Sequence, residues 1–182
     1  MNETDEKEKT MAETVTTDAT QYLTFTLGDE EFALDIAKVR EVLDYTVITK
    51  VPRMPDYMRG VINLRGNVVP VMDLRMKLGM SATEKTVNAC IVIVEIKVED
   101  EVLHMGALAD SVEEVLDLDP RQVEPPPKLG TGINQDFIRG MGKRDDKFII
   151  ILDIDKVLSG EDMSVISKAG DESLLEKEEQ AA

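Results

Sequence analysis

Apolar and polar residues alternate near the start of the chain, in the pattern of strands that have one buried face. Residues 22–27 (YLTFTL) and 32–36 (FALDI) both alternate, and Gly28 lies in the polar turn between them. This pattern predicts a β-hairpin. Asp35 is a candidate N-cap for a short helical turn over residues 36–39.

A second hairpin is predicted over residues 61–74. The apolar runs 61–64 and 68–74 flank the tripeptide Arg65-Gly66-Asn67. Glycine and asparagine tolerate the positive φ angles that tight turns require. The hairpin is therefore expected to present an arginine at its tip.

The remaining elements are predicted in the same way. Residues 90–98 (CIVIVEIKV) are rich in β-branched side chains and predict a buried strand, whereas the polar residues 81–88 predict a loop. The triple proline at 125–127 predicts a stiff extended connector. Other strands are expected at 102–109, 112–118 and 148–154, and short helices at 56–59, after Pro55, and at 137–140.

The second half of the chain repeats the first. VREVLD at 39–44 returns as VEEVLD at 112–117, an offset of 73 residues. YMRG at 57–60 returns as FIRG at 137–140, an offset of 80 residues, and residues 68–78 match 148–158 at the same offset. An offset that stays constant over this length indicates two copies of one supersecondary unit, and the period is too long for a solenoid.

The repeat predicts a mainly β fold of two similar lobes, at about 20–88 and 89–160, with exchange of elements between the lobes left open. Each lobe is expected to hold about five short strands and a brief helix. A small antiparallel sheet with one apolar face removes its free edges by closing into a barrel. Two such barrels side by side create a groove, which is a usual place for a partner to bind.

The two ends of the chain are more acidic than its middle. The 182 residues carry a formal net charge of -16, and residues 1–19 and 161–182 are acidic segments with few apolar residues. Such composition predicts flexible tails, and helix over part of the second tail is left open. No basic stripe is present to neutralise phosphates, which argues against nucleic acid as a partner.

Localisation is predicted from what the sequence lacks. The charged start MNETDEKEKT has no apolar region of a signal peptide, and no apolar run of about 18 residues predicts a membrane-spanning helix. The single cysteine, Cys90, rules out an internal disulfide and fits a reducing cytoplasm.

Candidate catalytic residues are few. His104 is the one histidine and lies in an alternating strand pattern, and Cys90 begins a core strand, so both are interpreted as structural. Asp73 and Asp153 occupy equivalent positions in the repeat, at the end of a strand and before a helix, which favours N-caps. A carboxylate-based hydrolase using these two acids is the remote alternative. No cofactor or metal is expected.

Arg65 is the residue for which the repeat offers a comparison. Its counterpart at the offset of 80 is Asp145, so the second copy is expected to do without an arginine at this point, whereas Glu41 returns as Glu114. This argues against a purely architectural role for Arg65. On the residues alone, a solvated turn charge and a functional contact are equally good interpretations.

Three stretches carry a resemblance to a known family. FTLGDEEFALDIAKVREV, PDYMRGVINLRGNVVPVMDLR and FIRGMGK followed by FIIILDIDKVL resemble the chemotaxis coupling proteins of the CheW family over residues 20–160. The same stretches would match the regulatory domain of the chemotaxis kinase CheA and the coupling half of CheV. The length leaves no room for a kinase core or a receiver domain, which favours a free-standing coupling protein.

The resemblance implies a non-enzymatic cytoplasmic adaptor with two intertwined five-stranded barrels. Such an adaptor bridges the cytoplasmic hairpin tip of methyl-accepting chemotaxis receptors to the regulatory domain of the histidine kinase CheA, in arrays at the membrane. It needs no cofactor and does not insert into the membrane. A coupling module for a chemosensory kinase outside chemotaxis, governing surface motility or development, is the alternative.

The resemblance also implies a set of receptor- and kinase-binding residues. Glu41 and Arg65 would form an interacting pair near the partner surfaces. Gly60, before the hairpin, matches a functionally sensitive glycine of the family. The apolar receptor-facing surface would include Val39, Val42 and, in the second lobe, Val115.

Overall fold

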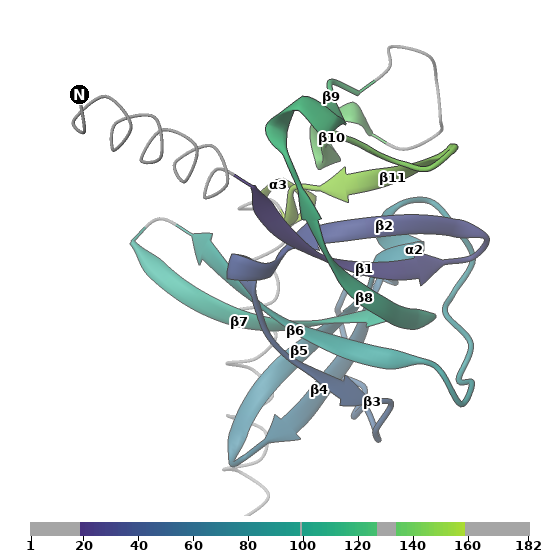
Figure 1. The fold of residues 1–182 in the computed structure, drawn as a ribbon. Coiled ribbons are helices and arrows are strands. Elements are labelled where there is room, and N and C mark those ends of the chain that lie inside the picture. The colour runs from purple at the N-terminus through teal and green to yellow at the C-terminus, as the bar shows by residue number, and fades with distance from the viewer. Residues whose placement is uncertain (1–18, 99, 127–133, 159–182) are drawn as a thin grey trace, which may run out of the picture.

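The computed structural model describes residues 19–98, 100–126 and 134–158 (Figure 1). The predicted tails lie outside this part of the chain except for residue 19, as does the end of the proline connector. Within these residues, eleven strands form two sheets. Sheet 1 has the order β8 (Ser111–Leu118), β1 (Thr20–Leu27), β2 (Glu30–Asp35), β11 (Lys147–Leu152), β10 (Ile138–Arg144), β9 (Val123–Glu124). Sheet 2 has the order β3 (Val39–Asp44), β6 (Cys90–Val98), β7 (Glu101–Ala109), β5 (Asn67–Asp73), β4 (Met58–Leu64).

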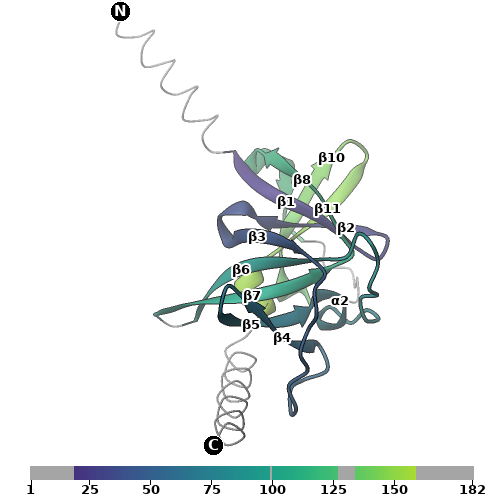
Figure 2. The ribbon, with the colours of Figure 1, turned by 90° about the horizontal axis from the view of Figure 1, so that it is seen from below.

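Neither sheet is built from one half of the sequence. The β1–β2 hairpin joins the late strands β8 to β11, and the β6–β7 hairpin joins the early strands β3 to β5. The lobes therefore exchange a hairpin, and the chain crosses between the sheets at Ile36–Lys38 (η1) and at Asp110. Figure 2 shows β1, β2 and β8 on one side of the molecule and β4, β5 and α2 on the other.

The two sheets share one topology, which explains the repeat. In the spatial order of each sheet, an edge strand (β3 or β8) lies beside the exchanged hairpin (β6–β7 or β1–β2), and a second hairpin (β5–β4 or β11–β10) lies on the other side of it. The pairs β5–β7 and β11–β2 are parallel, whereas the other pairs are antiparallel. The matched segments of the sequence are therefore structurally equivalent strands.

The predicted barrels are sheets that curl without closing into a ring of hydrogen-bonded strands. The strand order in each sheet is linear. In sheet 2 the chain leaving β3 meets β4 through a bridge between Thr49 and Val61, whose amides and carbonyls exchange bonds of 2.9 and 2.8 Å. In sheet 1 the equivalent contact is the pairing of β9 with β10. This continuation of the edge strand covers the far edge, as expected for edges that a fold must protect.

In the part of the chain that the structure describes, the buried side chains form three clusters. The largest draws on both sheets, and each sheet also encloses a smaller cluster of its own. β6 shows why its sequence is almost continuously apolar: Val92 and Val94 face the shared cluster, while Ile91 and Ile93 face the cluster inside sheet 2. A strand buried on both faces has no polar face to alternate.

The short helices among the described residues are η1, α2 (Leu74–Lys77), η2 (Pro120–Gln122), η3 (Gln135–Phe137) and α3 (Ile154–Val157). The helix predicted at 56–59 is wrong, because the amide of Met58 closes a turn onto Pro55 and β4 begins at once. The helix predicted at 137–140 is likewise wrong, because η3 ends at Phe137 and β10 follows. Pairing with the partner strand overrides the helical start signals. In the described part of the chain, no helix has the length and apolarity to cross a membrane.

Candidate functional site

A charged pair joins opposite edges of sheet 2. Arg65 donates from Nη1 to Oε1 of Glu41 and from Nη2 to Oε2, both at 2.8 Å, which is the bidentate fork geometry. Glu41 lies on the edge strand β3, and Arg65 lies at the tip of the β4–β5 hairpin. The Arg65 side chain is 73% exposed and that of Glu41 26%. The pair predicted from the family resemblance is thus formed, at the surface.

The hairpin tip holds Arg65 in an uncommon backbone conformation. Arg65 has φ +52° and Gly66 has φ +87°, so the turn uses the left-handed region at both positions. Asn67 instead begins β5, opposite Leu64. The asparagine that organises the turn is Asn63, whose Oδ1 accepts a 2.8 Å bond from the Gly66 amide. The turn was predicted correctly, but the roles of its residues were not.

The pair shifts both ionisation equilibria toward the charged forms. The hydrogen bonds from Arg65 lower the pKa of Glu41, and those to Glu41 raise the pKa of Arg65. Both groups are therefore charged at neutral pH, and the guanidinium is kept in one orientation on an exposed edge.

Acidification is expected to separate the pair. Because the pKa of Glu41 is lower in the folded chain, its contribution to stability is present above the ordinary carboxyl range and is lost as the pH falls through the folded pKa. Carbon-detected NMR titration of the Glu41 carboxyl group checks this. In Arg65→Gln the pKa of Glu41 should return toward its ordinary value, and an unchanged pKa would contradict the assignment.

The other predicted site residues fall into three environments. Val42 on β3 is 42% exposed, and Val115 on β8 is 49% exposed, so both are available to a partner. Val39 is half-buried and packs against the shared core. Gly60 is buried in β4, beneath Thr49. The structure therefore places Val42 beside Glu41 along β3 but with its side chain on the opposite face of the strand. It places Val115 on the other sheet, and it gives Gly60 a position that no partner can touch directly.

The second lobe contains the same kind of pair. Arg144, at the end of β10, is paired with Glu114 on β8, the counterpart of Glu41. Arg144 lies one residue before Asp145, which has φ +52° like Arg65. The second copy therefore has a hairpin arginine of its own, contrary to the prediction that it does without one. A comparison of the repeats that allowed a shift of one residue at the turn would have found Arg144.

Four of the seven large apolar side chains that are exposed in the described residues occur in equivalent pairs. Val42 and Val115 correspond at the offset of 73, and Val68 and Phe148 correspond at the offset of 80. All four are at least 42% exposed. Each sheet therefore carries an arginine–glutamate pair and two exposed apolar residues at matching positions. The sequence patterns did not mark Val68, Glu114, Arg144 or Phe148 as site residues.

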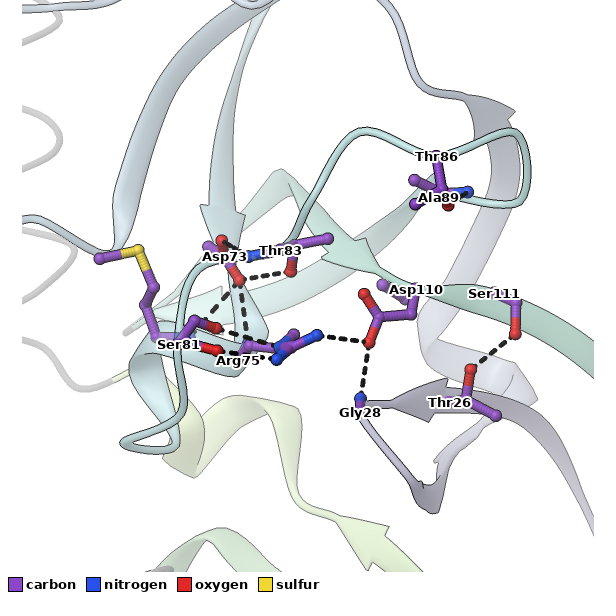
Figure 3. Close-up of polar contacts among 12 residues, drawn as sticks. Thr26, Gly28, Asp73, Arg75, Ser81, Thr83, Thr86, Ala89, Asp110 and Ser111 are labelled. Atoms are coloured by element: carbon purple, nitrogen blue, oxygen red, sulfur yellow. Dashed lines mark hydrogen bonds and ion pairs between the residues drawn. The ribbon is translucent and has the colours of Figure 1, made fainter.

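Asp73 is a structural residue. It is fully buried, and Oδ1 accepts from the amides of Arg75 and Met76 at the start of α2 and from the Thr83 hydroxyl (Figure 3). Its Oδ2 accepts from the Thr83 amide at 2.8 Å and lies 3.5 Å from Nη1 of Arg59. The N-cap prediction is confirmed for this acid. A carboxylate occupied in this way is poorly suited to act as a nucleophile or base.

Asp153 differs from its counterpart. It holds the N-cap position of α3 but makes no capping bond with its side chain. Asp73 ends a strand of sheet 2 and Asp153 follows a strand of sheet 1, so the two acids belong to different lobes. Among the residues described, no three acids, cysteines or histidines are grouped so as to hold a metal ion.

The other two candidates have ordinary surroundings. His104 on β7 is exposed, with Nε2 3.3 Å from Oε1 of Glu95. Cys90 is buried, and burial raises the pKa of its thiol to about 11. A thiol that stays protonated is a weak nucleophile, so both residues keep the structural roles predicted for them.

Comparison with known proteins gives one consistent family. The "Chemotaxis protein CheW" of Klebsiella aerogenes is 33% identical over 146 residues, which are 80% of this chain and 86% of that protein. The protein of the same name from Rhizobium meliloti is 33% identical over 151 residues, 83% of this chain and 95% of its own. The crystal structure of the scaffolding protein TtCheW from Thermoanaerobacter tengcongensis matches with a TM-score of 0.70 and 36% identity, covering 79% of this chain and 90% of that one.

The family-level comparison covers nearly all of the described fold. The sequence model of the CheW-like domain matches residues 21–162, from β1 through α3. Both sheets, the two exchanged hairpins and both arginine–glutamate pairs lie within this range. The chain therefore belongs to the CheW-like domain family, the mainly β scaffold proteins of chemotaxis.

Proposed function

We propose that this chain is a non-catalytic adaptor that couples methyl-accepting chemotaxis receptors to the histidine kinase CheA. The observation that carries the proposal is the Arg65–Glu41 pair, which presents an exposed guanidinium at the edge strand β3, the strand that also carries the exposed Val42. An exposed arginine held in one orientation by a bidentate bond is typical of an interface anchor. The relatives named as chemotaxis and scaffolding proteins support this assignment.

The mechanism is one of binding. Receptor helices present apolar anchors at helical spacing, and Val42 and Val115 offer apolar contact area on the two sheets. The hairpin surface around Arg65 contacts the regulatory domain of the kinase. A receptor signal changes kinase activity only if these contacts differ between the active and inactive arrangements. The adaptor acts in the cytoplasm and is recruited by this binding to arrays at the membrane.

Arg65→Glu is expected to keep the fold and to weaken coupling. The substitution places a second carboxylate against Glu41 at an exposed turn, so the core is untouched while the guanidinium anchor is lost. Loss of an arginine anchor predicts roughly tenfold weaker binding to the kinase regulatory domain. Calorimetric titration and receptor-dependent kinase activity in a reconstituted system measure both effects.

Arg121→Glu is the matched control, because Arg121 is 81% exposed and pairs locally with Asp119. It makes the same charge change away from the proposed surface and should bind normally. Full coupling by Arg65→Glu would remove Arg65 from the interface. Normal binding of both variants to CheA, together with capture of a kinase from another chemosensory pathway, would favour the alternative function.

Val115→Asp is expected to reduce receptor binding by about tenfold or more, because it places a charge on an apolar contact surface. Val115 is a better probe than Val39, which packs against the core. Val102→Asp is the control, since Val102 on β7 is 52% exposed, against 49% for Val115. Pull-down with receptor arrays measures the difference, and equal binding by the two variants would place the receptor site elsewhere.

A further inference from the structure

The Asp110 carboxylate connects the two sheets at the point where the chain returns from sheet 2 to sheet 1, and we call such a set of polar contacts between the sheets a tie. Asp110 lies at the crossover between β7 and β8. Its Oδ2 accepts a 2.6 Å bond from the amide of Gly28, in the β1–β2 turn of sheet 1, and a 2.9 Å bond from Nη1 of Arg75 on α2, which follows β5 of sheet 2 (Figure 3). The Arg75 and Asp110 side chains are only 19% and 23% exposed.

A second tie lies at the other crossover. Asp155 on α3, after the last strand of sheet 1, has its Oδ2 2.9 Å from Nζ of Lys38, at the crossover between β2 and β3. Its Oδ1 accepts a 3.3 Å bond from the amide of Lys97 on β6 of sheet 2. One carboxylate again joins a crossover, a helix and the opposite sheet.

The two ties are equivalent in position and opposite in charge. Arg75 and Asp155 correspond at the offset of 80, and each is the second residue of its helix, α2 or α3. On α2 a cation meets an acid at the crossover, and on α3 an acid meets a cation at the crossover. The acidic and the basic residue have changed places between helix and crossover, while the ion pair between the two elements remains. This pattern indicates that the link between helix and crossover is what the fold requires at both places.

These ties add directional contacts to the apolar packing of the shared core. The cluster between the sheets is built of side chains such as Leu34, Met72 and Ile150, and burial of apolar area stabilises without favouring one direction. Hydrogen bonds and ion pairs depend on distance and angle. Buried or partly buried polar contacts can therefore select one arrangement among several of similar apolar burial.

We propose that Arg75–Asp110 and Lys38–Asp155 are positioning pairs that fix the angle between the two sheets. The angle sets where the Arg65 surface on sheet 2 lies relative to Val115 on sheet 1. An adaptor that contacts two partners at once needs this spacing to be constant. The inference rests on the proposed function for its biological meaning, but the geometry can be tested on the free chain.

Residual dipolar couplings of backbone amides in the full chain measure the angle directly. In the unsubstituted protein, the couplings from both sheets should fit one alignment tensor. In Arg75→Asp and in Asp155→Lys, like charges face each other in one tie, so each sheet should fit a tensor of its own and the common fit should be lost. Lys38→Asp combined with Asp155→Lys restores opposite charges and should recover the common tensor.

The milder double variant Arg75→Gln and Asp155→Asn covers the case in which a charge reversal unfolds the chain. It removes the charges and keeps polar side chains, and it too should separate the tensors. Arg121→Ala, which removes an ion pair within the sheet 1 lobe, should leave them unchanged. A single tensor in the folded tie variants, in the same orientation as before, would overturn the proposal. No partner enters this experiment, so its result is independent of receptor and kinase binding.

Discussion

Replacing Gly60 with alanine is expected to destabilise the fold severely. Gly60 has φ +139°, and a Cβ there would lie 2.0 Å from the carbonyl oxygen of Thr49 and 2.7 Å from its carbonyl carbon. Both atoms belong to the backbone bridge between Thr49 and Val61, so neither can rotate away. The free energy of unfolding is expected to fall by more than about 4 kcal/mol, a loss that single substitutions cause only when they disrupt a specific structural feature.

Gly66→Ala is the matched control for this prediction. Gly66 also has a positive φ, +87°, but nothing lies within 4 Å of the added Cβ. Only backbone strain then applies, which costs about 1–2 kcal/mol. Urea unfolding followed by circular dichroism compares the two variants. Similar midpoints for both would show that the Thr49 contact is not what makes Gly60 necessary.

This result would also explain the sensitivity that the family resemblance assigned to Gly60. The residue is buried and lets the chain leaving β3 cover the edge of β4. Gly140 plays the same part in sheet 1, where an added Cβ would lie 2.6 Å from Cγ1 of Val123 on β9. A change at Gly60 should therefore impair partner binding through the shape of sheet 2. Purified Gly60→Ala would lose receptor and kinase binding together.

The alternation of apolar and polar residues predicted most of the strands, because it follows directly from which face of a strand is buried. The repeat also predicted that there are two similar units. Neither could show that the β1–β2 and β6–β7 hairpins change places, because the partner of a strand depends on contacts far along the chain. The helix expected at 56–59 failed for the same reason: its start signals were local, and the competing pairing with β5 was not.

The candidate site was accessible to sequence reasoning only in part. Arg65 stood out as a turn residue, but its contact with Glu41 forms because sheet 2 curls until its edges approach. Only the family resemblance supplied that pair. Arg144 was overlooked because the two hairpin tips differ by one residue in where the arginine lies. The exposed fraction that separates Val42 from the half-buried Val39 requires coordinates.

Replacing Asp73 with alanine is expected to have the second large effect on stability. The same replacement at Asp153 is the control within the same chain. Asp73→Ala removes the α2 cap and leaves the Thr83 amide and hydroxyl without their acceptor in a buried site. Loss of one member of a buried, hydrogen-bonded charged group costs about 3–5 kcal/mol. Asp153→Ala removes a side chain that makes no capping bond, so the expected change is within about 0.5 kcal/mol.

Comparing the two alanine variants shows whether the stabilisation comes from a charge at the N-cap position or from the hydrogen bonds that the side chain makes. Both acids occupy the N-cap position of equivalent helices, and the sequence treats them alike. If the position itself were stabilising, for example through the charge at the helix start, the two variants would lose similar free energy in chemical denaturation. A large loss for Asp73 alone would show that the bonds to Thr83 and α2 carry the effect. Asp73→Asn, which keeps one oxygen acceptor, should then fall between the two.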